Sequence, residues 1–287
     1  MLGDIYKVKS DKFLTLWVTY CILYTEVIKI FDEKFKIRVS DFLKESLDLD
    51  AKSFGFVKEN GEANFNLFLN KLIPNLLELK KERRAKILNY AINAFEIEGN
   101  DYSRAEDIIN ELNSIYDEIY FSDAELDKLN QVVWIRPTKE TLAVFDEIME
   151  SETEITGLDT SSYIRNMLNE FSRFPRYKKE QITFSEECEL TCLARESGRV
   201  LKFRYDGELK RAYVFACVYD YLAIQGNYIL CYDIERKIIC RYQISEIYAL
   251  HLLDKKYKPS EALQNACKKY ENDALWVDDE IIEWEEE

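Results

Sequence analysis

Two stretches of the chain repeat one pattern, a short strand followed by two helices. The first copy is expected at residues 36–40, 41–54 and 64–80, and the second at residues 132–136, 138–150 and 160–174. Each copy holds only one strand, and a lone strand leaves a row of backbone N–H and C=O groups without partners. The strands of the two copies are therefore predicted to pair with each other, as a two-stranded ribbon capped by four helices.

The alternation of side chains predicts which face of this ribbon is exposed. Ile37 and Val39 are expected in the core, and so are Val133 and Ile135. Successive side chains of a strand lie on opposite faces. The outward side chains are then Lys36, Arg38 and Ser40 in the first strand and Val132, Trp134 and Arg136 in the second. A protruding two-stranded ribbon is one of the few shapes that fit the major groove of DNA.

The helices of each copy carry apolar stripes at helical spacing. In the first copy the second helix has Phe65, Phe68, Leu69, Leu72, Leu76 and Leu79. In the second copy the first helix has Leu142, Phe145 and Met149, and the second helix has Tyr163, Ile164, Met167, Leu168 and Phe171. Pro74 should kink its helix or leave one carbonyl unpaired. Residues 86–129 are expected to be a helical connector between the copies.

Units of this kind resemble the ribbon-helix-helix DNA-binding fold, over residues 36–84 and 132–178 with both halves in one chain. The resemblance implies that outward strand side chains read bases and that the starts of the second helices lie on phosphates. The candidate nucleic-acid-binding residues are then Lys36, Arg38, Ser40, Asn64, Trp134 and Arg136, with Lys80 or Arg83 near phosphates. Trp134 stands where a polar reader is expected, and Asp159 would repel a phosphate unless it caps its helix. The alternative is that the strands only hold the fold together.

From Gly198 the pattern changes from helical to strand-like. Strands are expected at residues 200–205, 212–216, 221–224, 228–232, 238–244 and 247–253, with a hairpin turn at Asp206 and Gly207. Several short strands at this spacing predict a small, strongly bent barrel. The fold class is therefore α+β, with a mostly helical tandem ribbon-helix-helix domain followed by a small β-barrel.

The barrel segment resembles the WYL domain, an Sm-like barrel of bacterial and phage regulators. The residues that carry the likeness are 201–205, Arg211, 226–229, Asp233 and 241–247. The resemblance implies a pocket for an anionic ligand, such as a nucleotide or a nucleic-acid end, lined by Tyr205, Arg211, Tyr228, Arg241 and Gln243. Glu246 stands where the family has a basic residue, so either the ligand differs or the barrel is structural.

Composition sets limits on partners and location. The net charge is −15, and residues 271–287 hold nine acidic residues, read as a solvated tail or as a self-inhibitory cover for a basic face. An acidic chain binds a polyanion only through a local basic face. The seven cysteines lack a C-x-x-C pair and are interpreted as buried thiols in the cytoplasm, without a metal or other cofactor. Residues 13–25 are uncharged but too short to span a membrane.

Catalytic motifs are missing from the sequence. His251 is the one histidine, and its apolar neighbours suggest a packed core residue. No phosphate-binding glycine loop or nucleophile motif is present, so an enzyme is not expected.

These observations divide the chain into an N-terminal helical segment (1–30), a double ribbon-helix-helix domain (31–180), a WYL domain (186–257) and a C-terminal helical and acidic tail (258–287). They predict a homodimeric, ligand-responsive transcriptional regulator that binds DNA. Proteins that pair the same two folds also accompany RNA-targeting CRISPR effectors of type VI-D. An accessory protein that binds RNA or such an effector is the alternative, and an interaction scaffold is a third reading.

Overall fold

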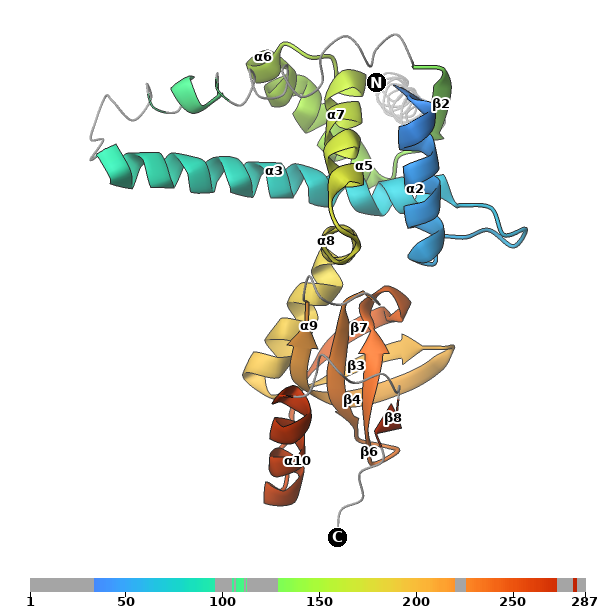
Figure 1. Ribbon diagram of the computed structural model, residues 1–287, viewed down its shortest axis with the longest axis vertical. Helices are drawn as coiled ribbons and strands as arrows, with labels where there is room; N and C mark the ends of the chain where they lie inside the picture. The colour runs from blue at the N-terminus through green and yellow to red at the C-terminus, as the bar shows by residue number, and fades with distance from the viewer. Residues whose placement is uncertain are drawn as a thin grey trace, which may run out of the picture.

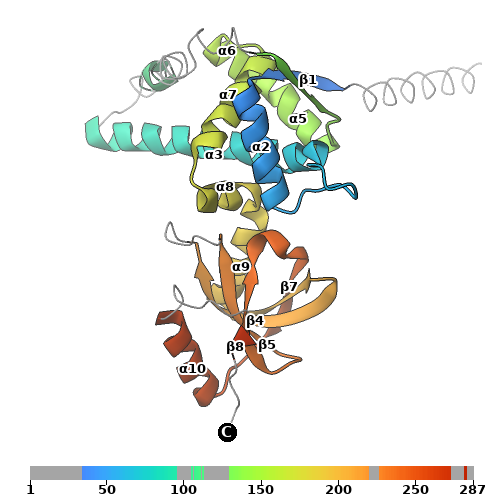
Figure 2. The same ribbon diagram turned by 45° about the vertical axis from the view of Figure 1, so that its right-hand side comes forward.

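The computed structural model describes residues 34–95, 105, 107–110, 112, 129–219, 226–272 and 281–282. The expected segment 1–30, the expected strand 221–224 and most of the acidic tail lie outside the described residues, as does much of the connector. Helices surround a two-stranded ribbon at one end of the molecule, and a curved antiparallel sheet forms the other end (Figure 1, Figure 2). The expected α+β class is confirmed.

The two lone strands pair with each other, as the sequence predicts. Strand β1 (Phe35–Val39) is antiparallel to β2 (Gln131–Ile135), and the register places Lys36 opposite Trp134 and Arg38 opposite Val132. The inward side chains are buried: Ile37, Val39, Val133 and Ile135. The expected inward and outward faces of both strands are therefore confirmed.

The helices of the first copy begin with side-chain caps. Helix α2 (Asp41–Ser53) starts where the Ser40 hydroxyl accepts the N–H of Leu43, and it ends before Gly55, whose φ of +80° is left-handed. Helix α3 (Phe65–Phe95) is much longer than the expected 64–80. It takes up the first part of the expected connector, because no glycine or proline stops it after Pro74. Helical residues recur at 105, 107–110 and 112.

The second copy departs from a regular helix. Helix α5 (Lys139–Glu147) passes into a π-helical turn, η2 (Ile148–Glu152), and then α6 (Thr153–Thr156). This turn buries Ile148 and leaves Met149 exposed, so the expected apolar stripe is wrong at Met149. Helix α7 (Thr160–Arg173) agrees with the expected 160–174, and the Asp159 carboxylate caps it by accepting the N–H of Ser162 at 2.9 Å.

Each long helix packs against the strand of the other copy. Helix α3 contacts β2, where Asn66 Oδ1 accepts the backbone N–H of Arg136 at 2.7 Å. Helix α7 contacts β1, where the Ser161 hydroxyl donates to the carbonyl of Lys36 at 3.3 Å. The two copies are therefore interlocked and share one apolar core.

Pro74 creates one of the contacts between the copies. Its missing N–H leaves the carbonyl of Asn70 without a helical partner. The hydroxyl of Thr141 in α5 donates to that carbonyl at 3.2 Å, and Thr141 is fully buried. The Asn70 side chain also accepts the N–H of Thr138 at 2.8 Å and donates to the carbonyl of Arg136 at 3.0 Å. The carbonyl expected to be unpaired thus holds α5 against α3.

Replacing Thr141 with valine should lower the free energy of unfolding by about 1–3 kcal/mol, because it keeps the shape but leaves the buried Asn70 carbonyl without a donor. Chemical denaturation of both proteins measures this difference. The control is Thr153→Val. The Thr153 hydroxyl donates to the carbonyl of Met149 at an exposed position, so its loss should lower the free energy of unfolding by less than about 0.5 kcal/mol. Equal losses in the two variants would contradict the role of Thr141.

Among the described residues of the C-terminal half, six strands form one antiparallel sheet in the order β7-β3-β4-β5-β6-β8. The strands are β3 (Arg199–Tyr205), β4 (Glu208–Val218), β5 (Tyr228–Asp233), β6 (Ile238–Gln243), β7 (Tyr248–Lys256) and β8 (Ile281–Ile282). Asp206 and Gly207 form the expected turn between β3 and β4, with φ of 50° and 76°. Strand β8, from the acidic tail, pairs with the edge of β6.

The sheet is not shown to close. Strand β7 and the two-residue β8 are its edges, and no ladder joins them in the described part of the chain. The closed Sm-like barrel expected from the sequence is therefore not confirmed. The sheet is strongly bent but open in its hydrogen bonding (Figure 1).

Helices α8, α9 and α10 and a short 3-10 turn accompany the sheet in the part of the chain that the structure describes. Helices α8 (Arg176–Thr183) and α9 (Ser185–Ser197) connect the helical end to the sheet, and α9 packs on β3, β4 and β7. The 3-10 turn η3 (Ile244–Glu246) follows β6, and α10 (Glu261–Asn272) contacts β4 from the other side through a core that includes Leu263 and Cys267. One apolar core runs from the ribbon through α8 and α9 into the sheet.

His251 is exposed in β7, so its interpretation as a packed core residue is wrong. The register of β3 and β7 shifts between the pair Lys202–His251 and the pair Arg204–Tyr248, and Ala249 has a φ of 50°. This bulge changes the alternation of an edge strand, which a hydrophobic pattern does not reveal.

The cysteines agree in part with the expected buried thiols. Cys188, Cys231, Cys240 and Cys267 are buried, whereas Cys192 and Cys217 are half-buried, and all six are free. None of the helices that the structure describes is long and apolar enough to cross a membrane. Within the same residues, no group of three or more histidine, cysteine or carboxylate side chains could hold a metal ion.

Candidate nucleic-acid interface on the ribbon

The outward face of the ribbon carries two cations and two apolar side chains. Lys36, Arg38, Val132 and Trp134 are all exposed, with Trp134 at 53% and Val132 at 37% of their full surface. The ammonium group of Lys36 lies 5.7 Å from the centre of the Trp134 ring, within the range of a cation–π contact. The ribbon lies at the end of the molecule farthest from the sheet (Figure 2).

Arg136 lies just beyond the end of β2, and its side chain is exposed. Its backbone is held on both sides, since its N–H bonds to Asn66 and its carbonyl to Asn70. The structure therefore brings Lys36, Trp134 and Arg136 to the same end of the ribbon, with Arg38 two register pairs further along, at the next outward position of its strand.

Ser40 and Asn64 serve as helix caps. The Ser40 hydroxyl accepts the N–H of Leu43 at 3.2 Å, and Asn64 Oδ1 accepts the N–H of Leu67 at 3.2 Å. Ser40 also lies outside β1, which ends at Val39. Both acceptor atoms are thus used locally to start helices, in addition to any contact with a ligand.

The two further cations named from the sequence are used inside the helical end. The Lys80 ammonium lies 5.1 Å from the ring centre of Tyr163, and Arg83 forms an ion pair with Glu170. Both partners belong to α7. The structure therefore joins these cations to the second copy and not to the exposed face of the ribbon.

An acidic group, Asp41, lies at one end of the ribbon and restricts where a polyanion can lie. The Asp41 carboxylate accepts the side-chain N–H groups of Asn130 and of Gln131, and these bonds lower the pKa of Asp41 below its ordinary value. Asp41 is thus negatively charged beside the Val39–Gln131 end. The opposite end, with Lys36, Trp134 and Arg136, is the more favourable place for a phosphate.

The expected ligand residues of the sheet do not all come together. Tyr205 packs on Tyr242, with ring centres 4.7 Å apart, at the border of the core that continues into α8 and α9. Arg211 is exposed and pairs with Glu235 at 3.4 Å. Neither residue lies with the other three.

Tyr228, Arg241 and Gln243 form a group on the neighbouring strands β5 and β6. Tyr228 is the register partner of Gln243, and the guanidinium of Arg241 lies 5.2 Å from the centre of the Tyr228 ring. Tyr228 belongs to the core under α10, a different core from that of Tyr205. The strand alternation that separates these two tyrosines follows from a register that the sequence alone does not reveal.

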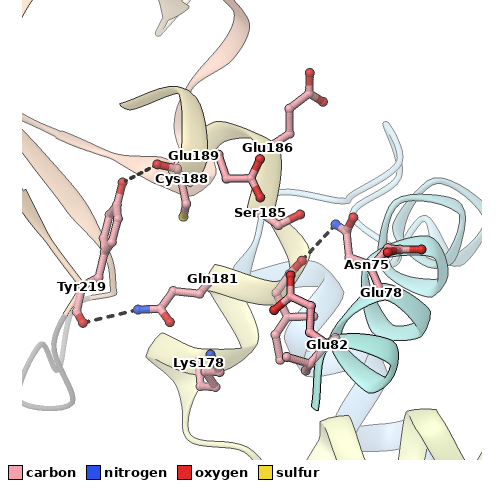
Figure 3. A pocket seen from close by; sticks show the side chains of 12 residues that line it. Asn75, Glu78, Glu82, Lys178, Gln181, Ser185, Glu186, Cys188, Glu189 and Tyr219 are labelled. Carbon is pink, nitrogen blue, oxygen red and sulfur yellow. Dashed lines mark hydrogen bonds between the residues drawn. The ribbon is translucent and has the colours of Figure 1, made fainter. Parts of the chain in front are cut away.

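A cleft of about 520 Å³ lies between α3, α8, α9 and Tyr219 (Figure 3). Its charged lining residues are four glutamates and one lysine. The glutamates are Glu78 and Glu82 of α3 and Glu186 and Glu189 of α9, and the lysine is Lys178 of α8. This charge balance repels nucleic acid, so the cleft does not extend the ribbon interface.

Two buried charges at the junction of the halves were missed by sequence reasoning. Lys179 and Glu180 are neighbours in α8, and their exposed fractions are 8% and 0%. The run Lys178-Lys179-Glu180-Gln181 has the composition of a solvated helix face, so no signal in the sequence marks them as buried.

No protein-family model matches the chain, and no curated protein matches it in sequence. A solved structure does share its fold. It is described as "Crystal structure of a CRISPR Cas-related protein" and superposes with a TM-score of 0.60. The match covers 86% of this chain and 73% of the other, at 13% sequence identity. At this identity the likeness shows the fold alone.

Proposed function

We propose that this protein is a CRISPR-associated accessory protein that binds single-stranded RNA on the outward face of its ribbon. The observation that carries the proposal is the exposed Trp134 ring with the Lys36 ammonium beside it and Arg38 two register pairs away, at the next outward position. Aromatic platforms flanked by cations are typical of proteins that bind unstacked bases.

The composition of this face favours single strands over a duplex. A ribbon that reads the major groove uses polar side chains that bond to base edges. Here Val132 and Trp134 supply two of the four outward positions of the paired strands. A stacked base contributes about 1–3 kcal/mol on an aromatic ring, largely independent of sequence. The net charge of −15 further disfavours long duplexes, which carry a dense row of phosphates.

The structural neighbour supports the CRISPR association. Its likeness extends over both the helical end and the sheet, since it covers 86% of this chain. The interlocked strands and helices support a ribbon-helix-helix assignment within one chain, and the sheet supports a WYL-like one.

A regulator that binds duplex DNA is the second candidate function. It is favoured by the shape of the ribbon, which is antiparallel, two-stranded and at the end of the molecule, with Arg38 pointing outward. Such a ribbon can enter a major groove, and arginine is the commonest reader of guanine.

Fluorescence anisotropy separates the two candidates. The protein is titrated against a labelled single-stranded RNA and against duplex DNA fragments from its own upstream region, each at two salt concentrations. The proposal expects tighter binding to the RNA, with a shallow salt dependence because few phosphates are contacted. Sequence-selective binding to duplex DNA that exceeds RNA binding would instead establish the regulator.

A further inference from the structure

The carboxylate of Glu180 is inserted from α8 into a set of N–H donors on the sheet. Glu180 Oε2 accepts the backbone N–H of Asn227 at 2.5 Å and its side-chain N–H at 2.9 Å. Glu180 Oε1 accepts the backbone N–H of Ser245 at 3.3 Å. Glu180 and Asn227 are both fully buried. Three N–H donors therefore converge on one carboxyl group in a buried site.

The local backbone leaves room for this carboxyl group. Gly226 has a φ of +103°, and a Cβ at that position would lie 2.6 Å from Glu180 Oε2 and 2.9 Å from Gln243 Nε2. Only glycine leaves room for the carboxylate there. The donor side chain is itself held, because Asn227 Nδ2 also donates to the carbonyl of Tyr177 at 2.7 Å.

The site is built from neutral donors. In the described part of the chain Glu180 has no ion pair with a lysine or arginine. Burial raises the pKa of Glu180, while the bonds from Asn227 and Ser245 oppose that shift. Convergent backbone and amide N–H groups that hold an anion without a cation are a recognised form of phosphate and carboxylate site.

The same helix is fixed to the helical end by the preceding residue. The Lys179 ammonium bonds to the Asp50 carboxylate of α2 at 2.8 Å, and both groups are largely buried. Asn75 of α3 donates to the carbonyl of Ile182 at 2.9 Å. Helix α8 therefore bonds to the helical end through Lys179 and to the sheet through the next residue, Glu180.

We propose that Glu180 is an internal ligand in an oxyanion site of the sheet, and that a free phosphate or carboxylate competes for this site and releases α8 from the sheet. An anion would thus act on the sheet by taking the place of the Glu180 side chain. This site is separate from the ribbon face, and the inference does not depend on what the ribbon binds.

Chemical rescue of Glu180→Ala tests the proposal. The variant vacates the site, so acetate or inorganic phosphate should raise its melting temperature by at least about 3 °C beyond the effect of chloride at equal ionic strength. The wild-type protein, whose site is filled, should show a smaller excess. If the variant is unfolded in chloride, circular dichroism measures its folded fraction in acetate and in chloride, and the two fractions are compared.

Two further variants make the outcome decisive. Glu180→Gln keeps the shape and one acceptor oxygen, so it should show little rescue. The double variant Glu180→Ala with Gly226→Ala places a methyl group in the vacated site and should lose the rescue. If Glu180→Ala responds equally to acetate, phosphate and chloride, or if the double variant is still rescued, the proposal is wrong.

A separate arm of the same experiment distinguishes a free small anion from the phosphorylated end of a nucleic acid. A short 5′-phosphorylated RNA is compared with its 5′-hydroxyl form and with inorganic phosphate. Rescue by inorganic phosphate assigns a small anion, and rescue only by the phosphorylated RNA assigns a chain end. RNA binding by the ribbon is measured on the wild-type protein, so failure of one proposal is distinguishable from failure of the other.

Discussion

Replacing Arg84 with methionine should lower the free energy of unfolding by about 3–5 kcal/mol, because it leaves a buried carboxylate without its cation. The Arg84 guanidinium makes two bonds to Glu152, at 3.1 and 2.7 Å, and the Tyr163 hydroxyl donates to the same carboxylate at 2.7 Å. Glu152 is only 3% exposed. Denaturant titration at neutral pH measures the loss.

The matched control is the neighbouring cation. Arg83 pairs with Glu170 at a more exposed position, where its side chain keeps 45% of its surface in solvent. Exposed pairs contribute little, so Arg83→Met should cost less than about 1 kcal/mol. Similar losses in the two variants would contradict the assignment of a buried pair to Arg84 and Glu152.

The effect of Arg84 should depend on pH with a defined sign. Burial raises the pKa of Glu152, but the bonds from Arg84 and Tyr163 outweigh it and hold the pKa below its ordinary value. A carboxyl with a lowered folded-state pKa stabilises the protein above its unfolded-state pKa, and this contribution is lost as pH falls through the folded-state pKa. The stability difference between wild type and Arg84→Met should therefore narrow on acidification below about pH 5. A stability difference between the two proteins that widened on acidification would contradict this assignment of the Glu152 pKa.

Replacing Trp134 with alanine should weaken binding of single-stranded RNA by about 5- to 150-fold, the equivalent of about 1–3 kcal/mol for one stacked base. The ring is 53% exposed and packs beside Lys36, so the substitution removes a binding surface without opening the core. Anisotropy titration with a labelled RNA measures the change. The far-UV spectrum and melting temperature should remain those of the wild type.

A second exposed aromatic residue provides the control for this prediction. Phe42 lies on α2 with 72% of its surface exposed, and it is not on the ribbon. Phe42→Ala should leave RNA affinity unchanged. Arg38→Ala should lower affinity and reduce the salt dependence by about one phosphate contact. Equal losses for Phe42→Ala and Trp134→Ala would move the binding site off the ribbon.

Much of the helical end could be predicted because its signals are local. The alternation in the two strands identified their buried and exposed sides, and the register then placed Lys36 opposite Trp134. The stripe on α7 was correct at every position, since a straight helix repeats its faces at a constant spacing. An Asp159 cap, which the sequence allowed without requiring, is also present.

Two of the errors lie where a regular element is interrupted. Ile148, the first residue of the π-helical turn η2, is buried three residues after Phe145, and Met149 is exposed. The bulge at Ala249 shifts the alternation of β7, and His251 is exposed. An extra residue in a strand moves the side chains that follow to the opposite face, and composition does not signal it.

The sequence by itself determined the two lone strands, their outward side chains and the change to a sheet after Gly198. These are properties of neighbouring residues along one chain. Only the tertiary structure decided which charges are buried and what they meet: Arg84 with Glu152, Lys179 with Asp50, and Glu180 with Asn227. From sequence alone, a charged side chain on a polar helix is expected to be exposed to solvent. Whether a segment distant in sequence covers it depends on packing between elements, which only the tertiary structure shows.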